Sequence, residues 1–326
     1  MKKVNVAVVG ATGLVGSTIV KILEERKLQI NEIYFFASKK SAGNVIVFNG
    51  KEHIVEELKG NSFEKKIDIA LFAAGGAVSQ KYAPIAVKKG VIVIDNSSVF
   101  RMEKNVPLVV PEINPEEIKR NKGIISNPNC TTIQAVVALK PLQDKIGIKR
   151  IVYSTYQAVS GSGLGGLKDL EEGNIEFYPY NIQYNTLPHI DSFLDNGYTK
   201  EEMKLVDETR KILQCDGLKI TATAVRVPVR YSHSISINLE LKKEFQMEEV
   251  FSVLKNAPGL VVRDKVDSNI YPMPLEAQGT DEVYVGRIRR DFSIENGLNL
   301  WVVADNIRKG AATNAVQIAE LLIKTL

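Results

Sequence analysis

Short apolar runs alternate with segments of helical periodicity through the first part of the chain. Residues 4–9 form a β-branched run typical of a buried parallel strand, and a helix pattern begins at Ser17. The same pattern predicts strands at residues 33–37, 68–74, 91–95, 109–110 and 123–126, and a helix at residues 79–89. Strands that alternate with helices and end in small or polar loops predict a doubly wound parallel sheet, which binds ligands at its carboxyl edge.

The second part of the chain has longer segments in which apolar and polar residues alternate. Strands are predicted at residues 150–159, 220–229, 234–241, 283–289 and 298–303, and helices at residues 165–172, 200–213 and 247–256. These elements predict a second domain in which helices flank an antiparallel or mixed sheet. The last segment, residues 311–326, has helical spacing and is expected to pack back onto the first domain.

The first strand runs directly into a glycine-rich turn, GATGLVG, at residues 10–16. Gly10 permits the tight turn, Gly13 lets the backbone approach a pyrophosphate, and Gly16 lets the helix pack close to the strand. The phosphates would lie at the N-terminus of that helix. The spacing is G-x-x-G-x-x-G rather than G-x-G-x-x-G, but its place between a strand and a helix predicts a dinucleotide-binding unit.

The loop after residues 33–37 bears on which dinucleotide is bound. An NAD site usually has an acidic residue here for the ribose 2′-hydroxyl, whereas this chain has Ser38-Lys39-Lys40-Ser41. Hydroxyl groups and two lysines suit the 2′-phosphate of NADP. The alternative is that Lys39 and Lys40 belong to a solvated loop; the feature favours NADP over NAD.

The composition is that of a globular protein, with 44% hydrophobic and 25% charged residues in a chain of 326. The 42 basic and 38 acidic residues give a formal net charge of +4 without a basic run, which suits an anionic ligand but does not indicate nucleic-acid binding. No apolar stretch approaches the about 20 residues of a membrane span, and no signal-peptide pattern follows Met1. A cytoplasmic protein without membrane association is therefore expected.

Cys130 follows a Pro/Asn turn and precedes a helix-compatible apolar run, so its thiol is predicted at a helix N-terminus. Unpaired N–H groups and the helix dipole favour an anion at such a place, which makes the sulfur a candidate nucleophile. The alternative for any single cysteine is a buried, inert thiol. Cys215 has no flanking turn or helix start and is expected to be incidental. No cluster of His, Cys and Asp has metal-ligand spacing, so no metal is predicted.

Several further segments carry a recognisable combination of motifs. They are residues 10–16, 37–43, 95–101, 126–132, 156–163, 201–204, 226–233 and 305–312. In their order and intervals they resemble the aspartate-β-semialdehyde dehydrogenases over essentially the full chain. The sequence NCTT at residues 129–132 is shared loosely with glyceraldehyde-3-phosphate dehydrogenases, but its combination with QAVSG at residues 157–161 and RVPVxxxH at residues 226–233 is more specific. Lys40 departs from the pattern, since many bacterial members have arginine there.

The resemblance implies an α/β chain with an N-terminal Rossmann-like doubly wound sheet at residues 1–129, completed by a C-terminal helix at residues 307–326. It also implies an α+β catalytic and dimerisation domain of the glyceraldehyde-3-phosphate-dehydrogenase-like type at residues 130–306. A homodimer through the second domain is expected, although tetramers occur in the family.

The resemblance further implies the reductive dephosphorylation of L-aspartyl-4-phosphate by NADPH, which gives L-aspartate-4-semialdehyde for lysine, threonine, methionine and diaminopimelate biosynthesis. An acyl phosphate is a poor hydride acceptor, so a thiolate first expels phosphate and forms a thioester, which hydride then reduces. Cys130 matches that nucleophile and His233 matches the family's acid/base histidine. Gln157 would donate a hydrogen bond to the thiohemiacetal oxygen or orient the attacking group.

The chain has three histidines, and elimination also favours His233. His53 lies in a polar segment and is expected at the surface. His189, in the sequence Leu-Pro-His-Ile, is expected to be structural.

Five residues are expected to bind the substrate. Arg226 offers a two-pronged donor for the α-carboxylate, and Glu201 would hold the ammonium group. Arg101 and Lys204 would bind phosphate, with Asn129 nearby. The alternative for Glu201 and Lys204, three residues apart on a predicted helix, is a surface ion pair.

The cofactor is expected to contact the glycine-rich turn, the loops after the next two strands and the glycine loop after Gln157. One asparagine near the C-terminus would reach the nicotinamide end. These residues are Gly10, Thr12, Gly13, Leu14, Val15, Gly16, Ser38, Lys40, Ser41, Ala73, Gly75, Ser160, Gly161, Gly163 and Asn306.

Two other functions fit parts of the pattern. A related acyl-phosphate reductase, such as N-acetyl-glutamyl-phosphate reductase, would use the same thiol and hydride chemistry. Glu201 argues against it, because a free substrate amine wants a carboxylate and an acetylated one does not. A catalytically inactive NADP-binding module could keep the glycine-rich turn, but would not need Cys130, Gln157, Arg226 and His233 together.

Overall fold

The computed structural model describes residues 3–325 of the chain. These fold into two compact units. One comprises Met1–Pro128 with Ala311–Leu326, and the other comprises Asn129–Gly310. The first boundary between the units lies between Pro128 and Asn129, one residue before the predicted boundary. The second lies between Gly310 and Ala311, whereas the prediction returned the chain to the first domain at residue 307.

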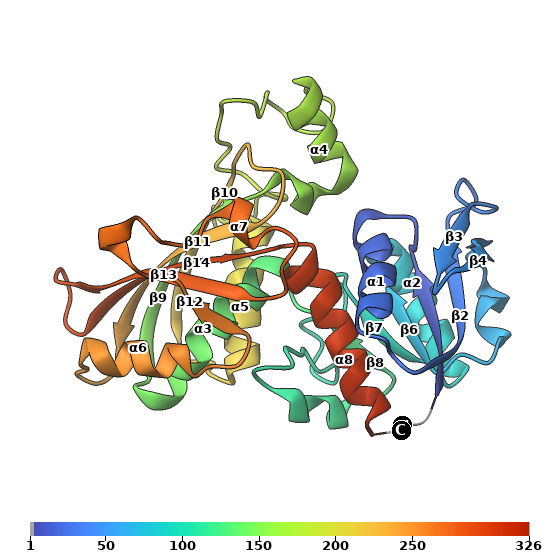
Figure 1. The fold of residues 1–326 in the computed structure, drawn as a ribbon, viewed down its shortest axis with the longest axis horizontal. Coiled ribbons are helices and arrows are strands. Elements are labelled where there is room, and N and C mark those ends of the chain that lie inside the picture. Colours follow the sequence, from blue (N-terminus) through green and yellow to red (C-terminus); the bar gives the residue numbers. More distant parts are fainter. Residues whose placement is uncertain (1–2, 326) are drawn as a thin grey trace. The chain divides into compact units, whose positions relative to one another are not determined.

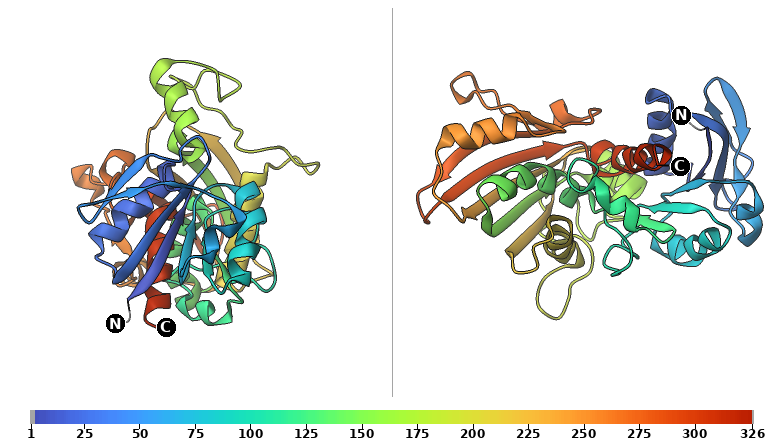
Figure 2. Two further views of the ribbon diagram at one scale, coloured as in Figure 1. Left: turned by 90° about the vertical axis from the view of Figure 1, so that its right-hand side faces the viewer. Right: turned by 90° about the horizontal axis from the view of Figure 1, so that it is seen from below.

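The first unit is built on a six-stranded parallel sheet, which faces the viewer in the left view of Figure 2. Its strand order is β5 (Glu56–Glu57), β2 (Ile30–Ala37), β1 (Val4–Val9), β6 (Ile69–Phe72), β7 (Ile92–Asp95) and β8 (Ile124–Ser126). The chain starts at β1 near the centre and winds outward in both directions, so the predicted doubly wound sheet is confirmed.

Alternate side chains of β1 belong to two separate cores. Val4, Val6 and Val8 pack with α1 (Leu14–Glu25) and α8 (Thr313–Ile323), whereas Ala7 and Val9 pack with α2 (Gly76–Lys88). Helices therefore cover both faces of the sheet, which explains why its strands read as continuous apolar runs. The C-terminal helix packs in the first unit as predicted, and Arg26, directly after α1, pairs with Glu320 of α8 at 2.7 Å.

Three predictions for the first unit were incomplete or wrong. Residues 109–110 form no strand, because only Leu108 makes an isolated bridge, to Ser126. The hairpin of β3 (Val45–Phe48) and β4 (Lys51–Ile54) was not predicted. Its turn residues, Asn49 and Gly50, both have positive φ, and an Asn-Gly pair between two strands is a strong sequence signal for a hairpin. Two short 3₁₀ helices, η1 (Gly60–Glu64) and η2 (Pro115–Arg120), were also not predicted.

The second unit contains a mixed six-stranded sheet, as predicted (Figure 1). Its order is β10 (Lys219–Arg226), β9 (Ile148–Gln157), β11 (His233–Leu241), β14 (Gly297–Ala304), β13 (Val283–Asp291) and β12 (Leu260–Val262). The outer pairs β10–β9 and β12–β13 are parallel, and the three inner pairs are antiparallel.

Helices cover one face of this mixed sheet. α5 (Lys200–Leu213) contacts β10, α6 (Met247–Lys255) contacts β12, and α3 (Cys130–Lys145) lies between them against the inner strands. On β9 the side chains of Ile151, Tyr153, Thr155 and Gln157 are buried, whereas Tyr156 is exposed. The alternation shows a face packed on helices and a face that is open in the single chain. Shorter helices α4 (Gly163–Glu172) and α7 (Pro274–Ala277) and the 3₁₀ helices η3 (Val159–Ser162) and η4 (Val266–Ser268) complete the unit.

Strand register places three predicted site residues at one edge of the sheet. Gln157 ends β9, and its register partner Arg226 ends the parallel neighbour β10. His233 begins β11 on the other side of β9, with the following residue opposite Tyr156. The ends of the parallel strands β9 and β10 and the beginning of the antiparallel strand β11 lie at the same edge of the sheet. Residues that are far apart in the sequence therefore meet there.

Candidate active site

Cys130 is the first residue of α3, so the predicted position of the thiol at a helix start is confirmed. Asn129 caps the helix, because its side-chain oxygen accepts hydrogen bonds from the N–H groups of Thr131 at 2.9 Å and Thr132 at 3.2 Å. Gly310 packs against Cys130: a Cβ added there would lie 2.9 Å from Cys130 Cβ. It belongs to a π-helical turn, η5 (Arg308–Ala312), a feature often found at functional sites.

The imidazole of His233 lies against this thiol. Its Nε2 is 3.3 Å from Cys130 Sγ, and its Nδ1 accepts a hydrogen bond from the backbone N–H of Ala158 at 3.0 Å. Since Nδ1 is an acceptor, the neutral ring carries its proton on Nε2, which points at the sulfur. Complete burial lowers the pKa of His233 well below 6.5, and the nearby charge of Arg226 lowers it further. At neutral pH the ring is therefore a neutral hydrogen-bond donor to Cys130.

Arg226 is a buried cation with spare hydrogen-bonding capacity. It is 4% exposed, and its Nη1 donates to the carbonyl of Ala158 at 2.7 Å. Its Nε is buried and has no hydrogen-bond partner in the structure. The guanidinium carbon lies 6.0 Å from the ring centroid of Tyr178. A buried arginine with an unused donor is the arrangement expected of a group that receives an anionic ligand.

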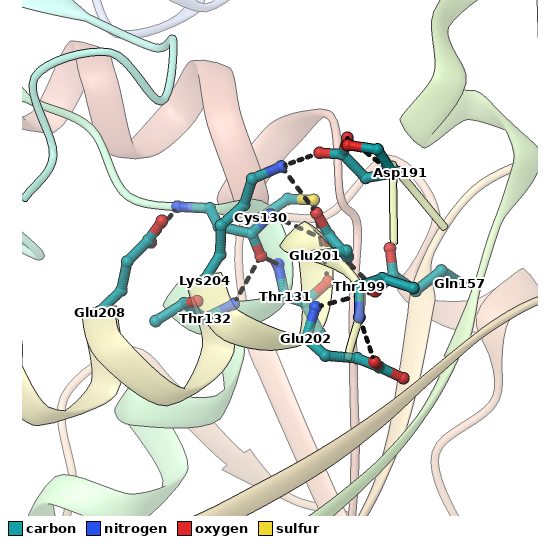
Figure 3. A network of polar contacts seen from close by, with 12 residues as sticks. Cys130, Thr131, Thr132, Gln157, Asp191, Thr199, Glu201, Glu202, Lys204 and Glu208 are labelled. Carbon is teal, nitrogen blue, oxygen red and sulfur yellow. Dashed lines mark hydrogen bonds and ion pairs between the residues drawn. The ribbon is translucent and has the colours of Figure 1, made fainter. Parts of the chain in front are cut away.

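Glu201 lies at the centre of a polar network on α5 (Figure 3). Its carboxylate accepts hydrogen bonds from Asn129 Nδ2 at 2.9 Å, from Gln157 Nε2 at 3.3 Å and from Lys204 Nζ at 3.1 Å. Lys204 also binds Asp191 at 2.8 Å. Burial alone would raise the pKa of Glu201, but Lys204, Asn129 and Arg226 together hold it below the usual range. Glu201 is therefore an anion, and Glu201 and Lys204 form more than a surface ion pair.

The glycine loop after β9 lines this site. A Cβ at Gly161 would lie 2.9 Å from Arg226 Nη1 and 3.3 Å from His233 Nε2, so a larger residue would collide with these two groups. Ser160 and Asn306 contact each other through their side chains at 3.0 Å, and Asn306 Oδ1 accepts from the N–H of Ser232 at 2.9 Å. Asn306 thus holds the segment that leads into His233. Gly163 has φ +73° and begins α4.

The first unit contains the glycine-rich turn and a second glycine at the next strand. Gly10 has φ +84°, and a Cβ at Gly16 would lie 2.0 Å from the carbonyl oxygen of Gly10, so both positions require glycine. Gly13 and Gly75 are the N-caps of α1 and α2, and neither helix has a side-chain cap. These helix starts follow the adjacent strands β1 and β6. Ala73 follows β6 directly, and its carbonyl oxygen would lie 2.6 Å from a Cβ added at Gly10. Uncapped N–H groups at both starts fit a dinucleotide's phosphates.

The other predicted residues of the first unit lie around these helix starts or at the same sheet edge. Thr12, Ser38 and Lys40 are exposed, and Leu14, Val15 and Ser41 are partly exposed. Arg101 is buried, and its Nε and Nη2 donate to the backbone carbonyls of Asn127 and Asn96 at 2.9 and 2.8 Å. The structure thus gathers Cys130, Gln157, His233, Arg226, Glu201, Lys204 and Asn129 in the second unit, and places Arg101 in the first.

Known proteins resemble this chain in both units. A family model described as "Semialdehyde dehydrogenase, NAD binding domain" matches residues 5–121, and one described as "Semialdehyde dehydrogenase, dimerisation domain" matches residues 139–309. The protein named aspartate-semialdehyde dehydrogenase from Aquifex aeolicus is 58% identical over 98% of both chains. The chain belongs to the aspartate-semialdehyde dehydrogenase family.

Solved structures of this family have the same fold. Aspartate semialdehyde dehydrogenase II from Vibrio cholerae, described as complexed with ASA, is 46% identical over 99% of both chains with a TM-score of 0.96. A Candida albicans aspartate semialdehyde dehydrogenase, described with NADP, is 27% identical over 99% of both chains with a TM-score of 0.80. The predicted family, fold class, oxidoreductase activity and nicotinamide cofactor are confirmed.

The other two histidines each pack against an aromatic ring, and the second cysteine accepts a hydrogen bond. His53 was expected at the surface, but its ring is half-buried and packs edge-on against Phe35 at 5.5 Å. His189 stacks on Phe193 at 4.3 Å. Cys215 Sγ accepts a hydrogen bond from Gln143 at 3.2 Å. Across residues 3–325, no helix is long and apolar enough to cross a membrane, and no group of His, Cys, Asp and Glu is arranged to hold a metal ion.

The sequence analysis did not identify Glu208, which belongs to the polar network around Glu201 and Asn129 (Figure 3). It is 1% exposed, and its Oε2 accepts the backbone N–H of Asn129 at 2.7 Å. A signal was available, because Glu208 falls on the apolar face of α5 with Leu205 and Ile212, where an unpaired charge would be costly.

Proposed function

We propose that this protein catalyses the reversible, NADPH-dependent reductive dephosphorylation of L-aspartyl-4-phosphate to L-aspartate-4-semialdehyde, in the biosynthesis of lysine, threonine and methionine. The observation that carries the proposal is the pairing of Cys130 Sγ with His233 Nε2 at 3.3 Å, at a helix start beside a buried arginine that has an unused donor. The relatives named aspartate-semialdehyde dehydrogenase, and the Vibrio cholerae structure described with ASA, support the choice of substrate.

Arg226 and Glu201 are proposed to orient the amino-acid end of the substrate. The unused Nε of Arg226 would bind the α-carboxylate, for which a guanidinium offers a planar pair of donors. Glu201 remains anionic in the structure and would receive the α-ammonium group. Lys204 would bind the phosphate by exchanging its contact with the exposed Asp191, and Arg101 and Asn129 are proposed to act with it.

The thiolate of Cys130 is proposed to attack the acyl carbon. The bond between that carbon and the phosphate oxygen breaks, phosphate leaves with the bonding electrons and takes a proton from solvent, and a thioester remains on Cys130. The N–H on Nε2 of His233 would stabilise the thiolate. The amide of Gln157, which donates to Thr155 and Glu201 in the structure, would exchange one of these contacts for the developing oxyanion. Once the thioester is reduced, the thiohemiacetal collapses to the aldehyde and returns the Cys130 thiolate.

His233 can carry a proton only if a contact in the structure changes. The second ring proton would sit on Nδ1, which accepts from the Ala158 N–H. The acid/base role implied by the resemblance therefore requires this hydrogen bond to break, whereas hydrogen-bond donation from Nε2 requires no change.

NADP is proposed as the cofactor, and when bound it supplies the hydride. The N-termini of α1 and α2, with Gly10, Gly13 and Gly75, would hold its pyrophosphate. Ser38, Lys40 and the neighbouring Lys39 are exposed at the end of β2, where a Rossmann-type unit binds the adenosine ribose, and would bind the 2′-phosphate.

A coupled assay tests the function. Purified protein with aspartate semialdehyde, phosphate and NADP⁺ should reduce the cofactor, and phosphate should be required. N-acetylglutamate semialdehyde in place of aspartate semialdehyde should give no turnover. Activity with the acetylated aldehyde alone would overturn the assignment, and inactivity with both would favour a binding module.

A homodimer formed through the second unit is also proposed, with the cytoplasm as its location. The open face of the mixed sheet carries Tyr156 and Trp301, whose ring centroids lie 5.5 Å apart, and part of the unit matches the model of a dimerisation domain. A reducing compartment suits a chain whose two cysteines are free and which needs one of them as a thiol. Light scattering of the purified protein should give the mass of a dimer; a monomer mass would contradict this.

A further inference from the structure

Glu208 belongs to the second turn of α5 after Glu201, on the same side of the helix (Figure 3). Its carboxyl group is buried, and its Oε2 lies 2.7 Å from the backbone nitrogen of Asn129. The residue following Asn129 is Cys130, so this contact ends one peptide away from the thiol. Glu208 is 79 positions from Asn129 in the sequence, so the contact fixes the start of α3 to α5.

Asn129 uses three groups at once. Its side-chain oxygen caps α3, its side-chain nitrogen donates to Glu201, and its backbone N–H donates to Glu208. Two glutamates of one helix therefore hold the residue before the nucleophile from two directions. The conformation of Asn129, with φ −59° and ψ 142°, sets where the first turn of α3 begins.

Of these three contacts, the one with Glu208 is made by the main chain of Asn129 itself. A buried N–H group needs an acceptor, and α3 itself offers none to a residue that precedes its first turn. Without the Glu208 carboxyl, Asn129 would have to turn toward another acceptor, and the peptide that carries Cys130 would turn with it. Sγ would then leave its place 3.3 Å from His233 Nε2.

We propose that Glu208 is a positioning residue for Cys130. By accepting the N–H of Asn129 it fixes the start of α3, and through it the distance between the thiol and His233. The inference rests on the proposed function for its effect on turnover, but its effect on the thiol is independent of the substrate.

Two substitutions at this position separate the acceptor from the charge. Glu208→Gln keeps an oxygen that can accept the Asn129 N–H, and Glu208→Met removes the acceptor at similar volume. Glu208→Met should lower kcat about 10- to 100-fold with little change in KM, because a small displacement of a reacting group costs that much. Glu208→Gln should restore most of this loss.

Thr209→Val is the matched control. Thr209 is the next residue of α5, is fully buried and shares a hydrogen bond with Tyr153 at 3.1 Å, away from Asn129. It tests whether any lost polar contact in this turn of α5 lowers activity. Thr209→Val should lower the thermal midpoint but leave kcat unchanged.

The rate at which iodoacetamide alkylates Cys130, followed across pH by mass spectrometry of the peptide that contains it, gives a readout without substrate. Glu208→Met should shift this pH profile, and Glu208→Gln and Thr209→Val should not. An unchanged profile and kcat in Glu208→Met, or an equal loss of kcat in Thr209→Val, would overturn the proposal. If Glu208→Met does not fold, Glu208→Asp, which withdraws the acceptor by one methylene, is read in the same way. If the wild type itself fails to turn over aspartate semialdehyde, a shifted profile in Glu208→Met would still support the positioning role, and the proposed function would be rejected.

Discussion

The two units use helix N-termini in opposite ways. In the first, α1 and α2 begin at Gly13 and Gly75, and no side chain caps either helix. In the second, α3 begins at Cys130, and the Asn129 side chain caps it with two hydrogen bonds. Uncapped N–H groups remain available to an external anion, whereas a capped start leaves the thiol as the exposed feature of the first turn.

The difference extends to the surrounding residues. In the first unit, the glycine-rich site is formed by backbone groups and by glycines that let backbone segments pack closely. The closest approach is at Gly16, where an added Cβ would lie 2.0 Å from the carbonyl oxygen of Gly10. The thiol unit surrounds its helix start with buried charged and polar side chains, among them Glu201, Glu208 and Arg226. The starts of α1 and α2 thus leave backbone N–H groups uncapped, whereas the start of α3 is surrounded by side chains that position the nucleophile.

The largest expected effect is that of removing the nucleophile. Cys130→Ala should lower kcat about 10⁴-fold or more, because no other group can form the thioester. The affinity for NADP should stay unchanged, since α1 and α2 lie in the other unit. Stopped-flow assays and calorimetric titration with NADP measure the two quantities. Retained turnover would rule out the covalent mechanism, and lost cofactor affinity would show that Cys130 also supports NADP binding.

Replacing His233 should have a smaller effect, and two variants distinguish its roles. His233→Ala should lower kcat about 10²- to 10³-fold, which is the usual contribution of a positioned proton donor or acceptor. His233→Gln offers an N–H near the place of Nε2 but cannot exchange a proton. If His233 acts as the hydrogen-bond donor that its Ala158 contact favours, His233→Gln should be markedly more active than His233→Ala. Equal loss in both variants would instead favour an acid/base role.

Glycine substitutions test the first unit separately. At Gly16 a methyl group would collide with the carbonyl oxygen of Gly10, 2.0 Å away, so Gly16→Ala should destabilise the protein by about 1–3 kcal/mol. At Gly13 the nearest atom is 3.4 Å away and φ is −80°, so Gly13→Ala should preserve the thermal midpoint. It should still raise the KM for NADPH, by about tenfold, because the methyl group occupies the approach to the phosphates. Unaltered KM in Gly13→Ala would argue against a pyrophosphate at this helix start.

The same contrast explains what the sequence could and could not predict. The glycine-rich turn is local: strand, turn and helix are adjacent in the chain, so spacing alone identified the nucleotide unit. Cys130 and its helix start were also readable locally. Elements whose existence depends on partners were not: residues 109–110 are apolar enough for a strand, but only Leu108 makes a bridge.

The residues around the thiol were predicted mainly from the resemblance to a known family, because local sequence patterns do not show which strands are neighbours. Gln157, Arg226 and His233 meet because β9, β10 and β11 are neighbours, which no local pattern states. Glu208 had a local signal, a charge on the apolar face of α5, but its partner Asn129 is fixed only by the packing of α3 on α5. The contact from Ala158 that sets the His233 proton is a backbone hydrogen bond and has no sequence signature at all.

A moderate effect on KM is expected when the aromatic contact of Arg226 with Tyr178 is removed. Asp169 of α4 accepts the N–H groups of Phe177 and Tyr178 at 2.9 and 2.8 Å, and so holds the Tyr178 ring near the guanidinium of Arg226. Tyr178→Leu should raise the KM for aspartate semialdehyde about three- to tenfold, with kcat nearly unchanged, because a cation–π contact is lost but no reacting group moves. Tyr180→Leu, at a position 67% exposed, is the control and should leave KM unaltered. A fall in kcat without a change in KM would show that Tyr178 supports something other than substrate binding.

The smallest expected effect is on stability, and it separates the burial of His233 from its chemistry. Its pKa in the folded protein lies well below 6.5, through burial and the charge of Arg226, whereas in the unfolded chain it is about 6.5. Below that pH the unfolded chain binds a proton that the native protein does not, so the stabilisation is complete above about pH 6.5 and is lost as the pH falls toward the folded value. Urea midpoints of the wild type should therefore decrease as the pH is lowered from about 6.5 to 5, with a slope that His233→Gln reduces. Since Cys130→Ala leaves His233 buried, it should keep the wild-type slope; a slope equal in all three proteins would place the responsible titration elsewhere.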